Sequence, residues 1–287
     1  MATSLTFERL KARYCLGVIV LAWYIQPGVN FLQSNALKSL WYWHDLISLY
    51  YGDFVIALFV VVAAYASKLD VQALFGRTPR RSDIWPVVVT DVFLYCVGEA
   101  LITLIFTSVS FLYPKFAIWW LNWTWEPSVY ITTEGSLPLF ANSLNFLSLV
   151  VLGPALEEIL FRGYLLHRWS RKWGLGLGIF ASSAIFGAIH PDPLGAAIFG
   201  VGMSLLYLRT QSLYVPILAH SIYNLGVWFR DLYGVLDEGI DYYRYELEQF
   251  QSDWWIGVVG AILAILIADV YIRRAKLGGP HRLPPLK

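Results

Sequence analysis

Two adjacent glutamates, Glu157 and Glu158, interrupt an apolar stretch of the chain that runs from residue 150 to residue 164. A carboxylate near the centre of a membrane-spanning helix costs at least about 2.5–3.5 kcal/mol, so a pair of them there indicates a function. Arg162 follows Glu158 by one helical turn, and this spacing predicts an ion pair. Glu157 points about 100° away from Glu158 around the helix and is left without that partner. The spacing therefore predicts one anchored acid and one acid that is free to do chemistry.

Three further polar residues lie in the apolar segments that follow. His190 ends one of these segments, four residues after Phe186, and His220 lies with Asn224 in another. The i,i+4 spacing puts His220 and Asn224 on the same face of a helix. A Glu–His pair and a His–Asn pair together can bind a water, take its proton and donate hydrogen bonds to a developing oxyanion. Those are the groups that hydrolysis of an amide requires.

Each of these residues also has a purely structural interpretation. An intramembrane Glu–Arg pair often serves packing or topology, and a histidine at a helix end before a proline is often a capping or interfacial residue. His220 and Asn224 could bridge helices by hydrogen bonds. The combination of five polar positions within 68 residues, on three long apolar helices, favours a catalytic site.

Other acids in apolar segments lack such a pattern. We expect Asp91 and Glu99 to face a polar cavity or to lie near an interface, and Asp53 to be solvated near the end of a span. The glycines at 174–178 and at positions 195, 200 and 202 are typical of close helix packing and not of a phosphate-binding loop.

The sequence resembles the CPBP family of CAAX-protease and bacteriocin-processing membrane proteins, which is related to the type II CAAX prenyl endopeptidase. The resemblance covers about residues 139–229 and rests on three short motifs that occur in the family's order on apolar helices. These motifs are Glu157-Glu158-Ile-Leu-Phe-Arg162, Phe186-x-x-x-His190 and His220-x-x-x-Asn224.

The resemblance implies a role for each motif residue. The implied catalytic residues are Glu157, Glu158, His190, His220 and Asn224, with Arg162 and Phe186 as structural support. Glu157 would be the general base that activates a water, and His190 would share that water. His220 and Asn224 would form the oxyanion site, while the second glutamate and its arginine would hold the constellation in place. The family is described as glutamate-dependent, so no cofactor is expected. The chain has no His-Glu-x-x-His motif, although a Glu/His/His zinc site with an open position stays chemically open.

The composition is that of a membrane protein. Of 287 residues, 57% are hydrophobic and only 14% are charged, whereas a soluble domain has about 25% charged residues. The net charge of +1 gives no indication of a nucleic-acid partner. The two cysteines, Cys15 and Cys96, have no metal-binding or redox spacing. The basic start is followed by an apolar stretch without a small-residue cleavage site, which predicts an uncleaved first span.

The apolar segments predict an all-α, polytopic bundle of about eight transmembrane spans. They run over residues 14–33, 49–67, 84–113, 139–166, 174–190, 193–208, 212–229 and 254–272. The prolines of the turn at 191–193 predict a break between the fifth and sixth segments. If the fifth segment crossed the membrane straight, His190 would lie near its outer end while Glu157 lay near the middle. The two can meet only if that helix is offset, tilted or starts deep.

The positive charges predict the orientation. With the N-terminus in the cytoplasm, 16 basic residues fall on the cytoplasmic side and four on the outer side, with Arg162 inside a span. The four outer residues are Lys38, Lys115, Arg230 and Arg244. This bias places both termini in the cytoplasm and the acidic loop 230–253 outside.

The function predicted from the sequence is that of a multi-pass intramembrane endopeptidase of the cell membrane. It would hydrolyse a peptide bond of a membrane-associated protein or peptide within the lipid bilayer. Residues 1–138 would form helices without an assignable motif, residues 139–229 the protease core, and residues 230–287 an outer loop, a last span and a basic tail. One alternative is a non-proteolytic scaffold or immunity-type binding protein of the same family. Another is a transporter or proton relay, which would spread polar residues over repeated halves of the chain.

Overall fold

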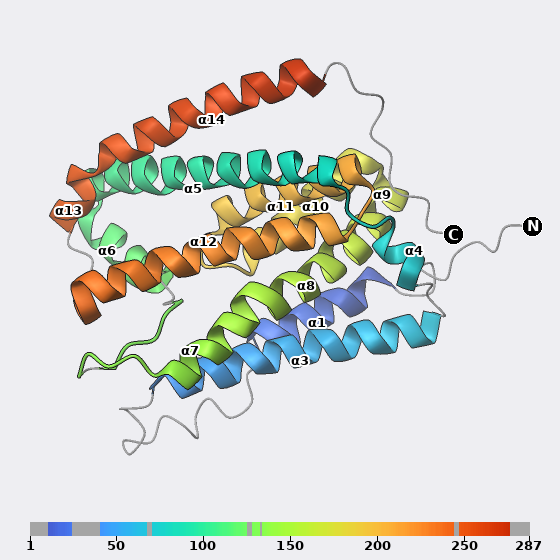
Figure 1. The fold of residues 1–287 in the computed structure, drawn as a ribbon, viewed down its shortest axis with the longest axis horizontal. Coiled ribbons are helices and arrows are strands. Elements are labelled where there is room, and N and C mark those ends of the chain that lie inside the picture. Colours follow the sequence, from blue (N-terminus) through green and yellow to red (C-terminus); the bar gives the residue numbers. More distant parts are fainter. Residues whose placement is uncertain are drawn as a thin grey trace, which may run out of the picture.

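The computed structural model describes residues 11–24, 41–67, 71–124, 128–132, 134–243 and 247–275. These residues form helices joined by loops, and one isolated antiparallel bridge pairs Gly76 with Ser212. The all-α prediction is therefore confirmed. Figure 1 shows most of the long helices running roughly parallel or antiparallel to one another, as in a bundle.

Each of the eight apolar segments contains a helix in its described residues, and residues 25–33 of the first segment lie outside the part of the chain that the structure describes. The helices are α1 (Ala12–Tyr24), α3 (Trp41–Ser67), α5 (Ile84–Leu112), a continuous rod from Leu139 to Trp173, α10 (Leu175–Ala188), α11 (Pro193–Thr210), α12 (Tyr214–Glu238) and α14 (Trp254–Ala275). The rod consists of α7 (Leu139–Phe146), η4 (Leu147–Leu152), α8 (Gly153–Glu158), η5 (Ile159–Leu166) and α9 (His167–Trp173). Four stretches in the described residues, within α3, α5, the rod and α11, are long and apolar enough to cross a membrane. The number of spans and the sidedness of the termini stay predictions.

The connecting segments contain more helix than the sequence indicated. The expected loop 114–138 begins with α6 (Pro114–Thr124), and Pro114 suits the first position of a helix because its missing N–H has no intrahelical partner there. The shorter elements α4 (Val71–Phe75), η3 (Arg81–Asp83), η6 (Gly239–Tyr243) and α13 (Leu247–Ser252) lie in other expected loops. Helix α12 continues nine residues past the expected end at 229. Its charged outer turns stay helical because Asp231 and Val235 are buried on one face.

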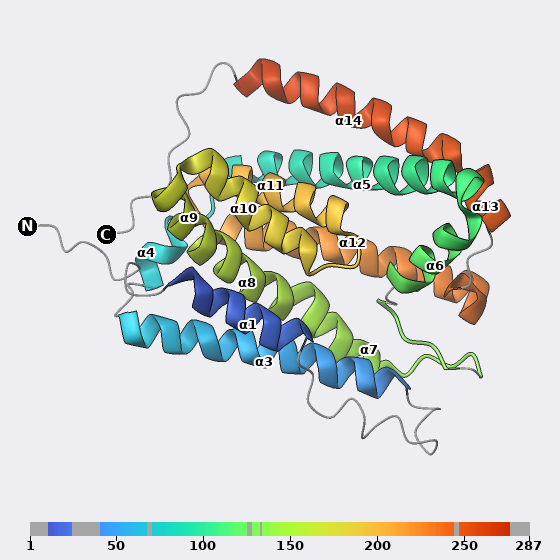
Figure 2. The same ribbon diagram turned by 180° about the vertical axis from the view of Figure 1, so that it is seen from behind.

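The helices are arranged around a central hairpin. Figures 1 and 2 place α4 and α9 at one end of the bundle, and α6, α13 and the start of α7 at the other. Helix α14 lies along α5 on one side, while α1 and α3 lie on the opposite side beside the rod. The hairpin of α10 and α11 lies between them and ends about half-way along α12 and α5 (Figure 2).

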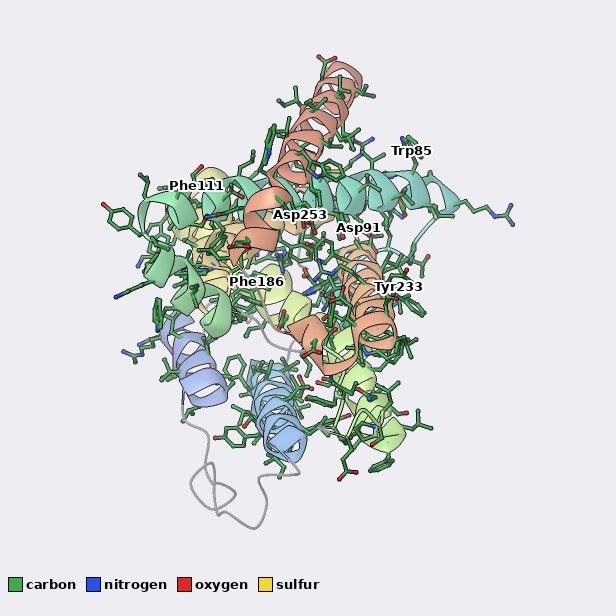
Figure 3. All side chains as sticks on the ribbon, turned by 90° about the vertical axis from the view of Figure 1, so that its left-hand side faces the viewer. Trp85, Asp91, Phe111, Phe186, Tyr233 and Asp253 are labelled. Atoms are coloured by element: carbon green, nitrogen blue, oxygen red, sulfur yellow. The ribbon has the colours of Figure 1, made fainter. Side chains whose placement is uncertain are left out.

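Apolar side chains are found both inside the bundle and on its outside. The main buried cluster is centred on η5 and α11, with Phe161, Leu165 and Met203 fully enclosed. Large apolar side chains also cover the surface, as Trp85, Phe111 and Tyr233 do at the periphery in Figure 3, where Phe186 lies in the interior. Water would oppose so much exposed apolar surface, whereas lipid accommodates it. The chain is a multi-pass integral membrane protein.

Candidate active site

The lengths of two antiparallel helices bring His190 level with Glu157. Glu157 lies 17 positions before Gly174, where the chain reverses, and His190 lies 16 positions after it. At about 1.5 Å per residue, both lie roughly 24 Å from the reversal. Because α10 is only 14 residues long, it does not carry His190 to the far end of the bundle. This short helix resolves the mismatch in depth that a straight crossing would cause.

Close packing fixes the position of α10. A Cβ atom at Gly178 would lie 2.1 Å from the hydroxyl oxygen of Ser170 in α9, and one at Gly187 would lie 2.2 Å from the carbonyl oxygen of Pro193 in α11. Neither position could hold a larger residue unless the backbone shifted. At the tip of the hairpin, the Asp192 carboxylate accepts a hydrogen bond from the Gly195 N–H at 3.1 Å and caps α11. The predicted close packing is confirmed at Gly178, Gly200 and Gly202, whereas a Cβ atom at Gly174 or Gly176 would meet nothing within 4 Å.

The two glutamates lie between two π-helical stretches. The glutamates end α8, with η4 before that helix and η5 after it. In η4 the Gly153 N–H donates to the carbonyl of Ser148, five residues earlier. In that register the next donor, to the carbonyl of Leu149, would be residue 154, which is a proline and has no N–H. The Leu149 carbonyl instead accepts a hydrogen bond from Asn224 Nδ2 at 2.8 Å. Such π-helical turns are frequent at functional sites.

Glu158 accepts hydrogen bonds from two helices at one oxygen. Its Oε1 accepts from Arg162 NH1 at 2.6 Å and from His220 Nδ1 at 3.0 Å. The Glu158 and Arg162 side chains are 0% and 1% exposed, which confirms the ion pair expected from their spacing. Arg162 NH2 also donates to the Gly200 carbonyl at 3.1 Å and so joins α11 to the rod. Breaking a buried, hydrogen-bonded pair of this kind leaves one charge uncompensated.

Phe186 lies between the arginine and the first histidine. The Arg162 guanidinium lies 4.8 Å from the centre of its ring, and the His190 ring stacks on it with centroids 4.3 Å apart. Phe161 meets it edge to face at 5.0 Å. Phe186 therefore contacts both groups, and its role as structural support stays a prediction.

Both imidazoles have their Nδ1 atoms engaged and their Nε2 atoms near Glu157. His190 Nδ1 donates to the Phe186 carbonyl at 2.6 Å, and His220 Nδ1 donates to Glu158. These bonds fix the orientation of both rings, and a neutral ring with Nδ1–H has its lone pair on Nε2. Each Nε2 lies 3.9 Å from the same atom, Glu157 Oε2. That separation is too long for a direct hydrogen bond, so Glu157 Oε2 lies near both nitrogens without being bonded to either.

The structure thus brings together most of the residues that the sequence singled out. Glu157, Glu158, His190 and His220 meet in one cluster, supported by Arg162 and Phe186. Asn224 lies one turn further along α12 and is bonded to the rod. Its expected oxyanion role stays a prediction.

The remaining acids of the apolar segments have different environments. Glu99 lies 3.3 Å from Arg230 NH1 on α12. Asp91 is buried in α5, and its two carboxylate oxygens have no hydrogen-bond partner within the part of the chain that the structure describes. Asp53 was expected to be solvated, but it is partly buried and accepts a hydrogen bond from Ser148 in η4. No signal in the sequence pairs Asp53 with the rod, because the contact joins helices about 95 residues apart.

The site is more open than a zinc centre. A tetrahedral zinc ion with bonds of about 2.0–2.1 Å keeps two ligand atoms about 3.3 Å apart. Glu157 Oε2 lies 3.9 Å from each histidine Nε2. Among the residues that the structure describes, no group of three or more His, Cys, Asp or Glu side chains is arranged to hold a metal ion.

The family model of the type II CAAX prenyl endopeptidase Rce1-like proteins matches residues 139–226 of this chain. Over these residues, which make up about a third of the chain, the protein is similar to the CAAX-protease (CPBP) family. The match begins with α7 and ends within α12, so the matched region contains every residue of the cluster just described, and Asn224. Helices α1, α3, α5 and α14 lie outside it.

The chain is also similar in sequence to a curated protein whose name describes a membrane peptidase. The chain is similar to the putative membrane peptidase YdiL of Bacillus subtilis (strain 168), with 35% identity over 80 residues. The similarity covers 27% of this chain and 33% of the relative. No solved structure matches the chain significantly.

Proposed function

We propose that this chain is an intramembrane endopeptidase that hydrolyses a peptide bond of a membrane-associated protein or peptide. The observation that carries the proposal is the convergence of His190 Nε2 and His220 Nε2 on Glu157 Oε2 at 3.9 Å each. The match of residues 139–226 to the family model and the similarity to a putative membrane peptidase support the reaction class. In this proposal the reaction is glutamate-dependent and uses no metal ion.

The catalytic water would lie between Glu157 and His190. It would donate one hydrogen to Glu157 Oε2 and the other to the free Nε2 of His190, which would leave an oxygen lone pair to face the substrate carbonyl. Glu157 would take a proton as the water attacks and would return it to the leaving amine. The side chains of Glu157 and His190 are 16% and 27% exposed, which makes them the most exposed groups of the cluster.

His220 would stabilise the oxyanion of the tetrahedral intermediate. Its Nδ1–H donates to the buried Glu158 carboxylate, which fixes the orientation of the ring, and in this proposal its Nε2 carries a hydrogen when it donates to the oxyanion. Glu158 would thus orient His220 through its Nδ1–H, as the aspartate of a Ser-His-Asp triad orients the catalytic histidine. Glu158 then acts as a positioning residue, and Arg162 balances its charge. Asn224 would contribute a second donor only if one of its amide hydrogens faces the substrate.

The test is proteolysis by the purified full chain in detergent against a library of membrane-anchored peptides, with fragments identified by mass spectrometry. The matched control is Glu157→Gln, which keeps the size and shape of the side chain. Cleavage by the wild-type chain that the control loses supports an endopeptidase. Binding of peptides without cleavage by either protein would favour the non-proteolytic binding protein instead.

A further inference from the structure

Residues 128–131 lie between two helices of the candidate site in the manner of a bound peptide. Val129 and Ile131 are buried against α12 beside Val235, whereas Tyr130 is buried on the other side against Leu46 of α3 and Ala141 of α7. Such alternation is typical of an extended backbone, which applies here to residues 130–132, whereas the chain bends at Ser128 and Val129. Beyond this segment the chain turns, with Thr132 and Ser136 bonded to each other, and returns to α7. Figure 1 shows this loop crossing from the region of α12 to the start of α7.

A side chain holds the backbone of this segment as a neighbouring strand would. Asn142 Oδ1 accepts from the Tyr130 N–H at 2.7 Å, and Asn142 Nδ2 donates to the Tyr130 carbonyl at 2.9 Å. This two-bond pattern is that of one residue pair in an antiparallel sheet. Asn145 Nδ2 donates to the Ser128 carbonyl at 2.7 Å, and the Ser128 hydroxyl donates to Asp231 at 2.6 Å. Because three of these four bonds go to the main chain, they do not depend on which side chains the held segment carries.

The same two helices lead from this segment to Glu157. Along the contact between α12 and the rod, His220 meets Glu158, Asn224 meets Leu149, and Trp228 meets Phe146. The last pair lies just before Asp231, which holds Ser128. Asp231 is eleven positions after His220, which corresponds to roughly 16 Å along the helix. An extended peptide covers that distance in about five residues.

We propose that this contact is a binding subsite for an extended polypeptide, which the chain's own residues 128–131 fill until a substrate segment displaces them. The proposal rests on the proposed endopeptidase function and names its substrate class. The substrate is a locally unfolded segment with apolar side chains at alternate positions, which enters from the end of the bundle that carries α6 and the start of α7. Its scissile bond lies about five residues beyond the substrate residue that takes the place of Ser128 beside Asp231.

A reversible covalent lock tests whether the segment must move. Ser128→Cys and Asp231→Cys would face each other, in a chain whose native thiols are removed by Cys15→Ala and Cys96→Ala. Oxidation should bring cleavage of a membrane-anchored substrate to near background, and dithiothreitol should restore it. The matched control is Thr132→Cys with Ser136→Cys, which closes the turn without fastening it to α12 and should leave turnover unaffected by oxidation. Equal cleavage by the locked and the reduced protein would overturn the proposal.

A second measurement does not depend on catalysis. Val129 is 0% exposed, so a cysteine there reports whether the segment has left its place. In the Glu157→Gln, Val129→Cys protein without the native thiols, a synthetic peptide that reproduces residues 126–133 should raise the rate of maleimide labelling several-fold. An unchanged labelling rate at saturating peptide would overturn the subsite even if the chain proves to be a protease. Accelerated labelling without any cleavage by the wild-type chain would support the subsite while the proposed function failed.

Discussion

Glu157 and Glu158 are consecutive residues, yet their carboxylates have opposite environments. The Glu158 side chain is fully buried and accepts hydrogen bonds from Arg162 and His220, whereas the Glu157 side chain is 16% exposed and lies 3.9 Å from two imidazole nitrogens. A step of about 100° around the helix separates an acid that holds the site together from an acid that can meet a substrate. The two residues should therefore fail in different ways when they are changed.

Glu157→Gln should abolish proton transfer and leave the fold intact. The expected loss of single-turnover rate is about 10²–10⁴-fold, which is the usual contribution of a general base. His190→Ala should cost a similar factor, and the double variant should lose little more because both residues hold one water. Asp91→Asn and Glu99→Gln serve as controls and should stay within about tenfold of the wild-type rate, because neither acid belongs to the cluster. Wild-type cleavage by Glu157→Gln, with loss in either control, would place the active site on another helix.

Arg162→Ala should lower the stability of the whole bundle as well as activity. It leaves the buried Glu158 carboxylate without its cation, and breaking such a pair costs about 3–5 kcal/mol. Arg162→Lys is the matched control, since it keeps the charge but cannot donate in a planar fork to both Glu158 and the Gly200 carbonyl. We expect thermal unfolding in detergent to rank wild type above the lysine variant and the lysine variant above the alanine variant. A wild-type melting temperature for Arg162→Ala would contradict the buried pair.

The sequence alone was sufficient to predict which segments are helical and which residues come together in the cluster. In lipid the backbone must satisfy its own hydrogen bonds, so long apolar runs are helices, and each of the eight runs is helical over most of its described residues. Spacing of four residues also gave the Glu158–Arg162 pair. The outer turns of α12 were missed because charge was taken as the sign of a loop. Asp231 is instead buried there and accepts a hydrogen bond from Ser128, about a hundred residues away.

Contacts that depend on helix register could not be predicted in the same way. Pro154 is visible in the sequence, but the carbonyl that it leaves without a donor depends on the π register of η4. The partner of that carbonyl, Asn224, depends on how α12 lies against the rod. The depth of His190 could have been found by counting from Gly174 in both directions, since the two distances differ by only one residue.

Removal of metal ions should leave cleavage unchanged. The gap of 3.9 Å between Glu157 Oε2 and each histidine Nε2 is wider than the separation of about 3.3 Å between the ligands of a tetrahedral zinc ion. Turnover should survive exhaustive dialysis against a chelator, and elemental analysis should find less than one zinc per chain. If stoichiometric zinc is found and its removal abolishes turnover, then the residues assigned as base and oxyanion donor become metal ligands.

The charge distribution predicts the orientation of the bundle. Sixteen basic residues on one side against four on the other favour a cytoplasmic location for the end that carries α4 and α9. Reporter fusions at Arg77 and after Ala275 should both read as cytoplasmic, and a fusion at Gly239 should read as external. A cytoplasmic signal at Gly239 would contradict the eight-span arrangement.

Asn224 offers the sharpest separation between a structural and a catalytic role. If its main role is to satisfy the Leu149 carbonyl, Asn224→Ala leaves a polar group unpaired and should cost about 1–3 kcal/mol of stability. Pro154→Ala would supply the missing N–H in the same turn, so the double variant should recover much of that loss.

If Asn224 donates to the oxyanion, Asn224→Ala should instead lower turnover by about 10²–10³-fold, and Pro154→Ala should not restore it. The measurements are melting temperatures and single-turnover rates for the wild type, the two single variants and the double variant. A stability loss that Pro154→Ala rescues, with turnover restored in parallel, assigns Asn224 to positioning. A rate loss that persists in the stabilised double variant assigns it to the reacting atoms.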